Sequence, residues 1–345
     1  MSSKKFLFYA CLNYSYAILR PLQAVIRERG DEVKWFFGGK KINPDYLADD
    51  EERLHTIEEV MSYAPDATFV PGNNVPVFIP GLKVAVFHGF NVEKRSDAKG
   101  HFNIRGYFDL YCTQGPNTTG PFKKLAEQKQ HFSVKQTGWP ALDTLFNSPD
   151  PTPNDKATIL VCSTFTPRLS CAEPLFDTIK RLSLTGKWNW LIQFHPKMAK
   201  ETVDKYKAIQ HEHLTFVETD DVIPLLKQAD VMVCDTSSVI TMFLMLKKPV
   251  VTFKNASPKE HMIDIDDANY LEQSIEHALT RPEEKIQAIE RFIDDTHPYT
   301  DGQSSARVLQ AVDELLAGEN RAAKRKPLNL LRNYQMRKKL KYWKF

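Results

Sequence analysis

Short apolar runs alternate with longer amphipathic segments along most of the 345 residues. An apolar run bounded by Gly, Pro or Asn is typical of a buried strand, whereas apolar residues three and four apart indicate a helix with one buried face. In the first half this pattern predicts a helix that ends at Arg29 and further helices at 50–63 and 117–130. The strands predicted for the same half are 6–11, 32–37, 67–70, 83–87 and 110–113.

The second half repeats this alternation after a polar stretch, residues 147–155, that contains three prolines. The strands predicted there are 158–162, 189–194, 214–217, 231–234 and 250–253. The helices predicted there are 172–182, 200–209, 222–227 and 239–246, and helices dominate from 268 to 316.

Strands that alternate with helices indicate parallel sheets covered by helices, and a Pro-dense polar stretch marks a domain boundary. The chain is also longer than a single hydrophobic core usually serves. We therefore expect an α/β fold with two Rossmann-like domains, 1–146 and 147–317, followed by a basic amphipathic tail, 318–345. Two such domains with C-terminal helices indicate a glycosyltransferase-B type architecture, with the active site in a cleft between the domains.

The composition is that of a globular protein, with 42% hydrophobic and 26% charged residues. No apolar run approaches the roughly 20 residues that a membrane-spanning helix needs. The five cysteines are widely spaced without a CxxC pair, so we expect reduced thiols in a cytoplasmic protein. The motifs GxGxxG, GxxxxGK[ST] and HExxH are absent, and we expect neither a metal nor a cofactor.

Two histidines directly follow predicted strands: His88 comes after strand 83–87, and His195 comes after strand 189–194. In open parallel sheets ligands bind outside the carboxyl ends of the strands, and an imidazole with a pKa of about 6.5 suits a general base at neutral pH. Gly89 would let the chain turn closely past a ligand. The alternatives are a core histidine before a turn glycine and, for His195, a strand cap before a helix that starts with proline.

A third predicted strand, 231–234, ends at a run of four polar residues, Asp235, Thr236, Ser237 and Ser238. Hydroxyls and free backbone N–H groups at the start of a helix suit a phosphate group. Ordinary N-capping is the alternative, and both roles can hold at once. Thr164 and Arg168 lie in a hydroxyl-rich loop after strand 158–162, where a guanidinium group can pair with a phosphate.

The last 22 residues, 324–345, contain nine Lys or Arg and no Asp or Glu. Because the whole chain carries +3, the other 323 residues carry a net charge of −6. Bases interleaved with Leu, Tyr and Trp are typical of a segment on an anionic membrane surface, where each base contributes about 1 kcal/mol. We expect this role, on the inner face of the cell membrane. A packed terminal helix is the alternative, and without a recognisable RNA-binding module we expect no nucleic-acid partner.

Four short motifs, in this order, resemble those of the CDP-glycerol glycerophosphotransferases, enzymes of teichoic-acid and capsule synthesis. They are His88-Gly89, His195-Pro196, the Asp-x-Ser-Ser of Asp235 to Ser238, and Lys248-Pro249 before an apolar strand. Gly138-Trp139-Pro140-Ala141-Leu142-Asp143 also looks like the family's Gly-x-Pro-x-x-Asp segment at the domain junction. The family's usual Trp-His-Gly-Thr-Pro is Phe87-His88-Gly89-Phe90-Asn91 here, a difference that falls on the acceptor side.

The resemblance implies transfer of glycerol phosphate from a CDP-glycerol donor to a hydroxyl of a membrane-linked glycan or polyol-phosphate acceptor, with release of CMP. It implies that His88 accepts the acceptor's proton, and that His195 with the Asp235 to Ser238 run holds the pyrophosphate. Two alternatives use the same fold: a nucleotide-sugar glycosyltransferase and a CDP-ribitol-dependent transferase. A further alternative is a non-catalytic, membrane-associated binding protein.

Overall fold

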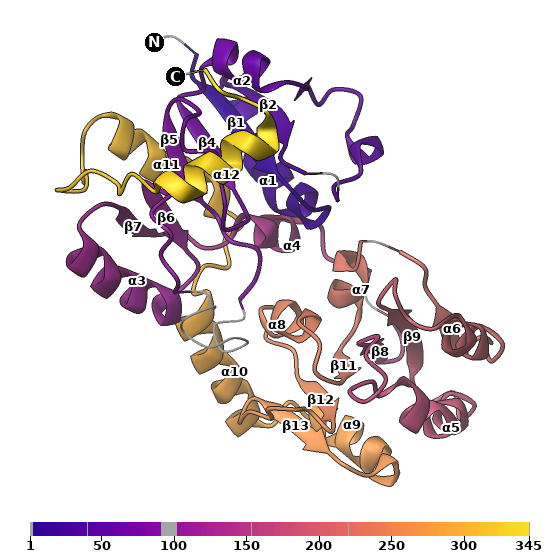
Figure 1. Ribbon diagram of the computed structural model, residues 1–345. Helices are drawn as coiled ribbons and strands as arrows, with labels where there is room; N and C mark the ends of the chain where they lie inside the picture. The colour runs from indigo at the N-terminus through magenta and orange to yellow at the C-terminus, as the bar shows by residue number, and fades with distance from the viewer. Residues whose placement is uncertain (1–2, 40, 91–101, 153, 220, 345) are drawn as a thin grey trace. The chain divides into compact units, whose positions relative to one another are not determined.

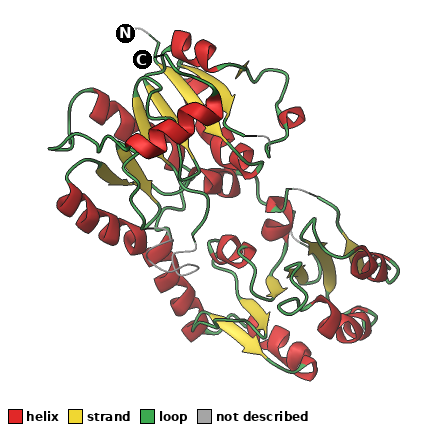
Figure 2. Cartoon of the chain, viewed as in Figure 1, coloured by secondary structure: helices red, strands yellow, loops and turns green. Residues whose placement is uncertain are grey.

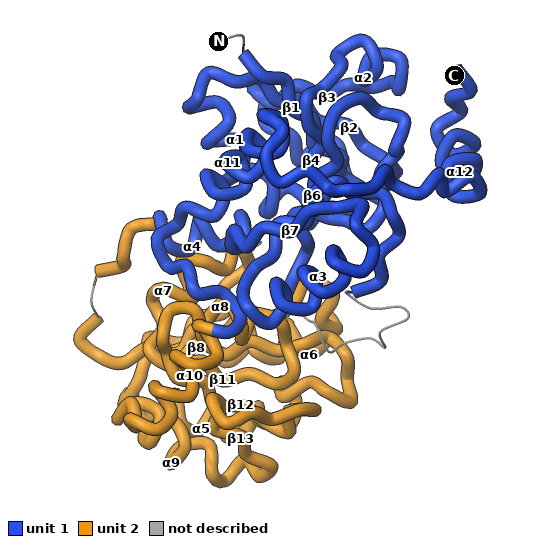
Figure 3. The backbone as a smooth tube through the Cα atoms, turned by 90° about the vertical axis from the view of Figure 1, so that its left-hand side faces the viewer, with its two compact units in different colours: residues 1–147, 295–345 blue, residues 148–294 orange. Residues whose placement is uncertain are grey.

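The computed structural model describes residues 3–39, 41–90, 102–152, 154–219 and 221–344. The chain forms two compact units, coloured separately in Figure 3. Unit 1 consists of residues 1–147 and 295–345, and unit 2 consists of residues 148–294. Each unit is built on its own parallel sheet, drawn with yellow strands in Figure 2.

Unit 1 contains a seven-stranded sheet in the order β3-β2-β1-β4-β5-β6-β7, with every described pairing parallel. Its strands are β1 Lys5–Ala10, β2 Glu32–Phe37, β3 Arg53–Leu54, β4 Ala67–Val70, β5 Leu82–Ala85, β6 Leu110–Thr113 and β7 Ser133–Gln136. Its α-helices are α1 Tyr14–Glu28, α2 Ile57–Tyr63, α3 Pro116–Lys129, α4 Asp143–Asn147, α11 Ser304–Leu316 and α12 Leu330–Leu340, with short 3-10 turns at Pro44–Tyr46 and Pro140–Leu142.

Unit 2 contains a six-stranded parallel sheet in the order β10-β9-β8-β11-β12-β13. Its strands are β8 Thr158–Ser163, β9 Asn189–Phe194, β10 Leu214–Phe216, β11 Val231–Cys234, β12 Val250–Phe253 and β13 Met262–Ile265. Its helices are α5 Ala172–Ser183, α6 Lys200–Lys207, α7 Ile223–Gln228, α8 Val239–Leu244 and α9 Leu271–Leu279, with a 3-10 turn at Ala268–Tyr270. The second boundary between the units falls near the end of α10, Glu283–Thr296.

Both sheets have the doubly wound strand order of a Rossmann fold, so the predicted α/β class with two Rossmann-like units is confirmed. The strand order reverses between β1 and β4 in unit 1 and between β8 and β11 in unit 2. At such a point the loops after the two neighbouring strands diverge and leave a crevice that binds ligands. These two positions are therefore where site residues are expected in each unit.

The central strands β4, β8 and β11 are buried on both faces, as parallel sheets covered by helices require. In β1, Leu7 and Tyr9 belong to the apolar cluster on one face, whereas Phe8 packs edge-on against Trp35 at 5.0 Å between ring centroids. In unit 2, Ile159 of β8 lies in the corresponding core cluster and is fully buried. This burial holds the carboxyl ends of the strands in place.

One predicted helix was too long, because residues 50–63 contain the short strand β3 before α2. Thr56 ends the extended segment: its hydroxyl accepts from the Glu59 N–H at 3.2 Å, and the Glu59 carboxylate accepts from the His55 N–H at 2.6 Å. This reciprocal capping starts α2 at Ile57. Two strands, β7 and β13, were not predicted from the sequence. Both have four residues at one end of a sheet, and β7 is also largely polar.

Residues 295–317, which the sequence analysis placed in the second domain, belong to unit 1. The reason is Asp143, which is 4% exposed and accepts from the backbone N–H groups of Ser304 at 2.8 Å and Ser305 at 2.7 Å. This carboxylate, at the start of α4, thereby holds the N-terminus of α11 against unit 1. The tail 318–345 is also assigned to unit 1, not to a separate part of the chain.

Candidate active-site residues

In unit 2, Asp235 follows β11 at the point where the strand order reverses and is fully buried. Its Oδ2 atom accepts three hydrogen bonds from the loop after β8: Ser163 Oγ donates at 2.6 Å, Thr164 N at 3.0 Å and Cys171 N at 3.1 Å. A buried carboxylate needs this many donors to offset its lost hydration. Asp235 therefore positions the 163–171 loop, and its carboxylate is occupied within the protein.

Thr236 is also engaged, because its hydroxyl accepts from the Ala256 N–H at 2.9 Å. Among the described residues, the hydroxyls of Ser237 and Ser238 have no hydrogen-bond partner, and Ser238 is exposed. Ser238 precedes α8, a helix of only six residues, and makes no side-chain cap. N-capping, the alternative role for this run, is therefore not observed at Ser238, and both serine hydroxyls are available to a ligand.

His195 follows β9 and is exposed, with its ring 4.6 Å from that of Phe165. Its Nδ1 accepts from the Lys197 backbone N–H at 3.1 Å. An accepting Nδ1 carries no proton, so the neutral ring has its proton on Nε2. Burial, with a smaller contribution from the Lys197 ammonium, lowers the pKa of His195 and favours this neutral form. The side chain thus presents an N–H donor at the edge of the sheet.

Thr164 and Arg168 lie in the loop that Asp235 holds. Thr164 is half-buried and its backbone N–H is bound to Asp235, whereas the Arg168 side chain is exposed. Within the described part of the chain, Arg168 forms no ion pair. Phe165, between them, is 40% exposed and its ring contacts that of His195 at a tilt of 44°. The structure therefore brings the predicted residues of unit 2 to the ends of β8, β9 and β11.

In unit 1, His88 follows β5 and is exposed. Its Nδ1 lies 3.0 Å from the carbonyl oxygen of Pro71, the residue after β4. A carbonyl oxygen only accepts, so Nδ1 carries the proton and Nε2 is left as an unprotonated acceptor. The Tyr14 ring stacks on the imidazole, 5.3 Å between centroids at 17°. His88 follows β5, and these two contacts join it to residues that follow β4 and β1, the strands between which the sheet order reverses.

The backbone around His88 is held in an unusual conformation. Phe87 is 5% exposed and has φ +60°, a value rare for a bulky side chain. The Gly89 carbonyl accepts from Gln114 Nε2 at 2.8 Å. A Cβ added at Gly89 would meet no described atom, so packing within unit 1 does not impose the predicted close approach there. Asn91 of the same motif lies outside the described residues.

Three residues in these sites were not singled out from the sequence: Tyr14, Gln114 and Asn255. Asn255 Nδ2 donates to the Asp235 carbonyl at 2.7 Å and so ties the loop after β12 to the run 235–238. Tyr14 and Gln114 each come shortly after a strand, β1 and β6 respectively. Position after a strand was the available signal, but neither residue type suggests catalysis by itself.

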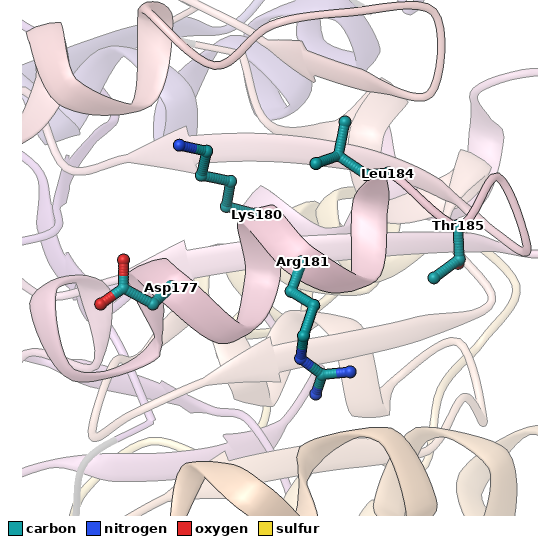
Figure 4. A pocket seen from close by; sticks show the side chains of 5 residues that line it. All are labelled: Asp177, Lys180, Arg181, Leu184 and Thr185. Carbon is teal, nitrogen blue, oxygen red and sulfur yellow. The ribbon is translucent and has the colours of Figure 1, made fainter.

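The hollow of about 440 Å³ in Figure 4 lies on one face of α5 and the turn that follows it. None of the predicted site residues lines it, nor do they line two further hollows of about 390 and 350 Å³. In the described parts of the chain, no three His, Cys, Asp or Glu side chains gather closely enough to hold a metal ion. Within the same parts, no helix combines the length and apolar character needed to span a bilayer.

Residues 108–259 match the model of the family described as CDP-Glycerol:Poly(glycerophosphate) glycerophosphotransferase. This confirms the family resemblance over a segment that contains His195 and the run 235–238 but not His88. A search of curated proteins finds no match.

Solved structures share the fold at low sequence identity. The wall teichoic acid polymerase TagF is 15% identical with a TM-score of 0.66, covering 92% of this chain and 90% of that chain. MnaA from S. aureus, solved with UDP, is 17% identical with a TM-score of 0.63, covering 94% and 100%. A UDP-N-acetylglucosamine 2-epimerase is 16% identical with a TM-score of 0.61, covering 92% and 97%. These neighbours confirm the glycosyltransferase-B type of fold.

Proposed function

From the match of residues 108–259 to the CDP-glycerol glycerophosphotransferases, we propose that this chain transfers glycerol phosphate from CDP-glycerol to a hydroxyl group. The acceptor is a membrane-linked glycan or polyol phosphate, and CMP is the second product. The likeness in fold to a wall teichoic acid polymerase supports a role in building a cell-surface polymer of the teichoic-acid kind.

In this reaction the acceptor oxygen attacks the phosphorus that bears the glycerol. A new P–O bond forms, and the bond from that phosphorus to the oxygen bridging to CMP breaks, so that CMP leaves with the electron pair. The proton of the acceptor hydroxyl passes to His88 Nε2. A positioned base of this kind contributes about 10²–10⁴-fold to the rate.

The negative charge that develops on the departing CMP needs hydrogen-bond donors. In unit 2 the His195 Nε2–H and the hydroxyls of Ser237 and Ser238 are unengaged within the described residues. They follow β9 and β11, the two strands that flank β8. Donors that are already oriented stabilise charge in the transition state without a reorganisation cost.

The opposite tautomers of the two histidines carry the proposal. The Nδ1–H of His88 donates a hydrogen bond to a carbonyl oxygen, which leaves Nε2 as an acceptor. In His195, Nδ1 accepts a hydrogen bond from a backbone N–H, which leaves Nε2–H as a donor. A general base requires the first arrangement, and a group that binds an anion while neutral requires the second.

The test is titration calorimetry with CDP-glycerol, CDP-ribitol, UDP-glucose and CMP, followed by a CMP-release assay on the donor that binds. We expect selective CDP-glycerol binding, and we expect His88→Ala to keep donor affinity while turnover falls about 10²–10⁴-fold. The matched control is His55→Ala, since His55 is an exposed histidine of the same unit. Equal turnover in the two variants would remove His88 from the mechanism.

The likeness to two UDP-linked structures keeps a nucleotide-sugar enzyme as the second candidate. The same titration separates the two, because its four ligands differ in the base or in the group attached to the phosphate. Selective binding of UDP-glucose would favour a nucleotide-sugar transferase. A preference for CDP-ribitol would change only the polyol that is transferred, and binding of none of the four would favour a scaffold without catalysis.

The tail supports a further part of the proposal, reversible attachment to the inner face of an anionic membrane. Leu330 and Leu331 at the start of α12 are 71% and 80% exposed, and the exposed aromatic rings of Tyr334 and Trp343 lie 5.5 Å apart. Apolar side chains beside several bases are what an interfacial segment presents to lipid. Co-sedimentation with vesicles tests this attachment.

A further inference from the structure

The backbone on either side of His88 is held by hydrogen bonds from other segments of unit 1. Before it, the Phe87 carbonyl oxygen accepts from Trp139 Nε1 at 3.4 Å. After it, the Gly89 carbonyl oxygen accepts from Gln114 Nε2 at 2.8 Å. Trp139 is 9% exposed and Gln114 is fully buried. The position of the backbone at His88 therefore depends on buried side chains that are distant in the sequence.

The peptide between Phe87 and His88 needs such a hold. The φ of Phe87, +60°, lies in the left-handed region, where a bulky side chain is strained. A strained residue keeps its conformation only where its surroundings impose it. The Phe87 ring is fixed by packing, since it meets Phe122 edge-on with 5.3 Å between ring centroids. The Trp139 N–H fixes the carbonyl oxygen, which belongs to the peptide that leads into His88.

Trp139 also contacts the chain beyond His88. The Phe90 ring packs edge-on against the indole, with 5.0 Å between ring centroids at 79°. The same Phe90 ring lies 5.9 Å from that of His297, at 89°. Trp139 thus contacts the residue before His88 and the residue two places after it. One buried side chain brackets the loop that carries the proposed base.

Trp139 is itself fixed by His297. This histidine is fully buried, and its Nε2 accepts from the Trp139 backbone N–H at 2.9 Å. Burial lowers the pKa of His297 to about 4, so the ring is neutral at pH 7 and Nε2 remains an acceptor. Gly138 has φ +80°, and a Cβ there would overlap His297 Nε2 and Ser304 Oγ. Glycine at this position lets the imidazole approach the next N–H along the chain.

The segment 138–143, which resembles a family motif, is anchored at its other end as well. Asp143 accepts from the backbone N–H groups of Ser304 and Ser305 and begins α4, labelled in Figure 1. A segment bound at both ends is a firm support for the indole that it carries. The motif Gly-x-Pro-x-x-Asp leaves its second position open, and this chain has Trp139 there.

We propose that Trp139 is a positioning residue for the transfer reaction: its indole N–H holds the left-handed Phe87 peptide and so sets the place of His88 Nε2. The inference rests on the proposed function, because it takes His88 as the base. The ring contacts with Pro71 and Tyr14 orient the imidazole, whereas Trp139 determines the position of the backbone that bears it. A base acts only within hydrogen-bond reach of the proton it takes, so a shift of this peptide slows the chemical step.

The test is Trp139→Phe, which keeps an aromatic ring beside Phe90 and removes the N–H. We expect kcat for CMP release to fall about three- to tenfold, the effect of one hydrogen bond. The KM for CDP-glycerol should not change, because the donor's pyrophosphate is assigned to unit 2. The matched control is Trp35→Phe, since Trp35 is fully buried in the same unit and its Nε1 donates to Gln23 at 2.7 Å. This control should lower the Tm and leave kcat unchanged. Equal kcat values in the two variants would overturn the inference.

A second measurement does not depend on turnover: nitrogen NMR of the histidine rings, with the His88 signals assigned from His88→Ala. In the wild type the bond from Nδ1–H to the Pro71 carbonyl fixes one tautomer of His88. Trp139→Phe should shift the His88 signals toward a mixture of the two tautomers, and Trp35→Phe should not. If the signals shift but CDP-glycerol is not turned over, the positioning stands and only the proposed function fails. If CMP is released and neither the signals nor kcat change, Trp139 has a structural role alone and the transferase stands.

Discussion

Asp235→Asn removes one charge from the centre of the unit 2 site and changes almost nothing in shape. The carboxylate is fully buried, and its Oδ2 accepts from Ser163, Thr164 and Cys171 at 2.6 to 3.1 Å. An amide in the same place can keep one oxygen among these donors, but its NH₂ group then faces the Thr164 N–H, which also donates to Oδ1 at 3.2 Å. The 163–171 loop should loosen as a result.

The magnitude follows from the hydrogen bonds. A bond to a charged group contributes about 1.5–3 kcal/mol and a neutral one about 0.5–1.5, so three bonds lose roughly 3 kcal/mol when the charge is removed. Burying a neutral group costs less than burying a charge, which offsets part of the loss. We expect a net loss of about 2–3 kcal/mol and, for a unit of this size, a Tm lower by about 5–10 °C.

Calorimetry measures the Tm, and hydrogen exchange measures opening at the two amides, Thr164 and Cys171, that donate to the carboxylate. The matched control is Asp230→Asn, since Asp230 is exposed and accepts from one backbone N–H, that of Thr158, at 2.8 Å. Donor affinity should fall about tenfold only in Asp235→Asn. If exchange at Thr164 and Cys171 is the same in both variants, Asp235 does not hold the loop and the argument is wrong.

Two other predictions concern unit 1. Burial lowers the pKa of His297 to about 4, so its contribution to stability is complete above the unfolded pKa of about 6.5 and is lost as the pH falls to about 4. Urea unfolding at pH 7, 5.5 and 4.5 should show that the free energy of unfolding of the wild type falls by about 3 kcal/mol as the pH is lowered, and that this loss is missing in His297→Gln. If the free energies of unfolding of the two proteins fall in parallel with pH, His297 does not cause the loss. For the membrane, Leu330→Ser with Leu331→Ser should reduce co-sedimentation with phosphatidylglycerol vesicles severalfold and leave turnover of glycerol unchanged, whereas unchanged binding would exclude this surface.

Much of the fold was predictable because it depends on local patterns. The apolar runs before His88 and His195 correspond to β5 and β9, and the Pro-dense stretch 147–155 contains the first boundary between units. Polar short strands such as β7 escaped detection, because pairing with β6 rather than its own composition makes that segment extended. The place of α11 was also hidden, since it depends on Asp143, which is more than 150 residues away from Ser304 along the chain.

The sequence by itself determined which residues end the strands, because buried parallel strands must be apolar and the polar groups that follow them are easily seen. Only the tertiary structure decided what each of those polar groups does. Hydrogen bonds between loops occupy the Asp235 carboxylate and leave Nε2 of His88 as an acceptor. A backbone N–H two residues along the chain leaves Nε2 of His195 as a donor. The tail's return to unit 1 depends on Tyr342 and Leu340 finding apolar partners there. Such contacts join residues far apart in the chain, and no local pattern encodes them.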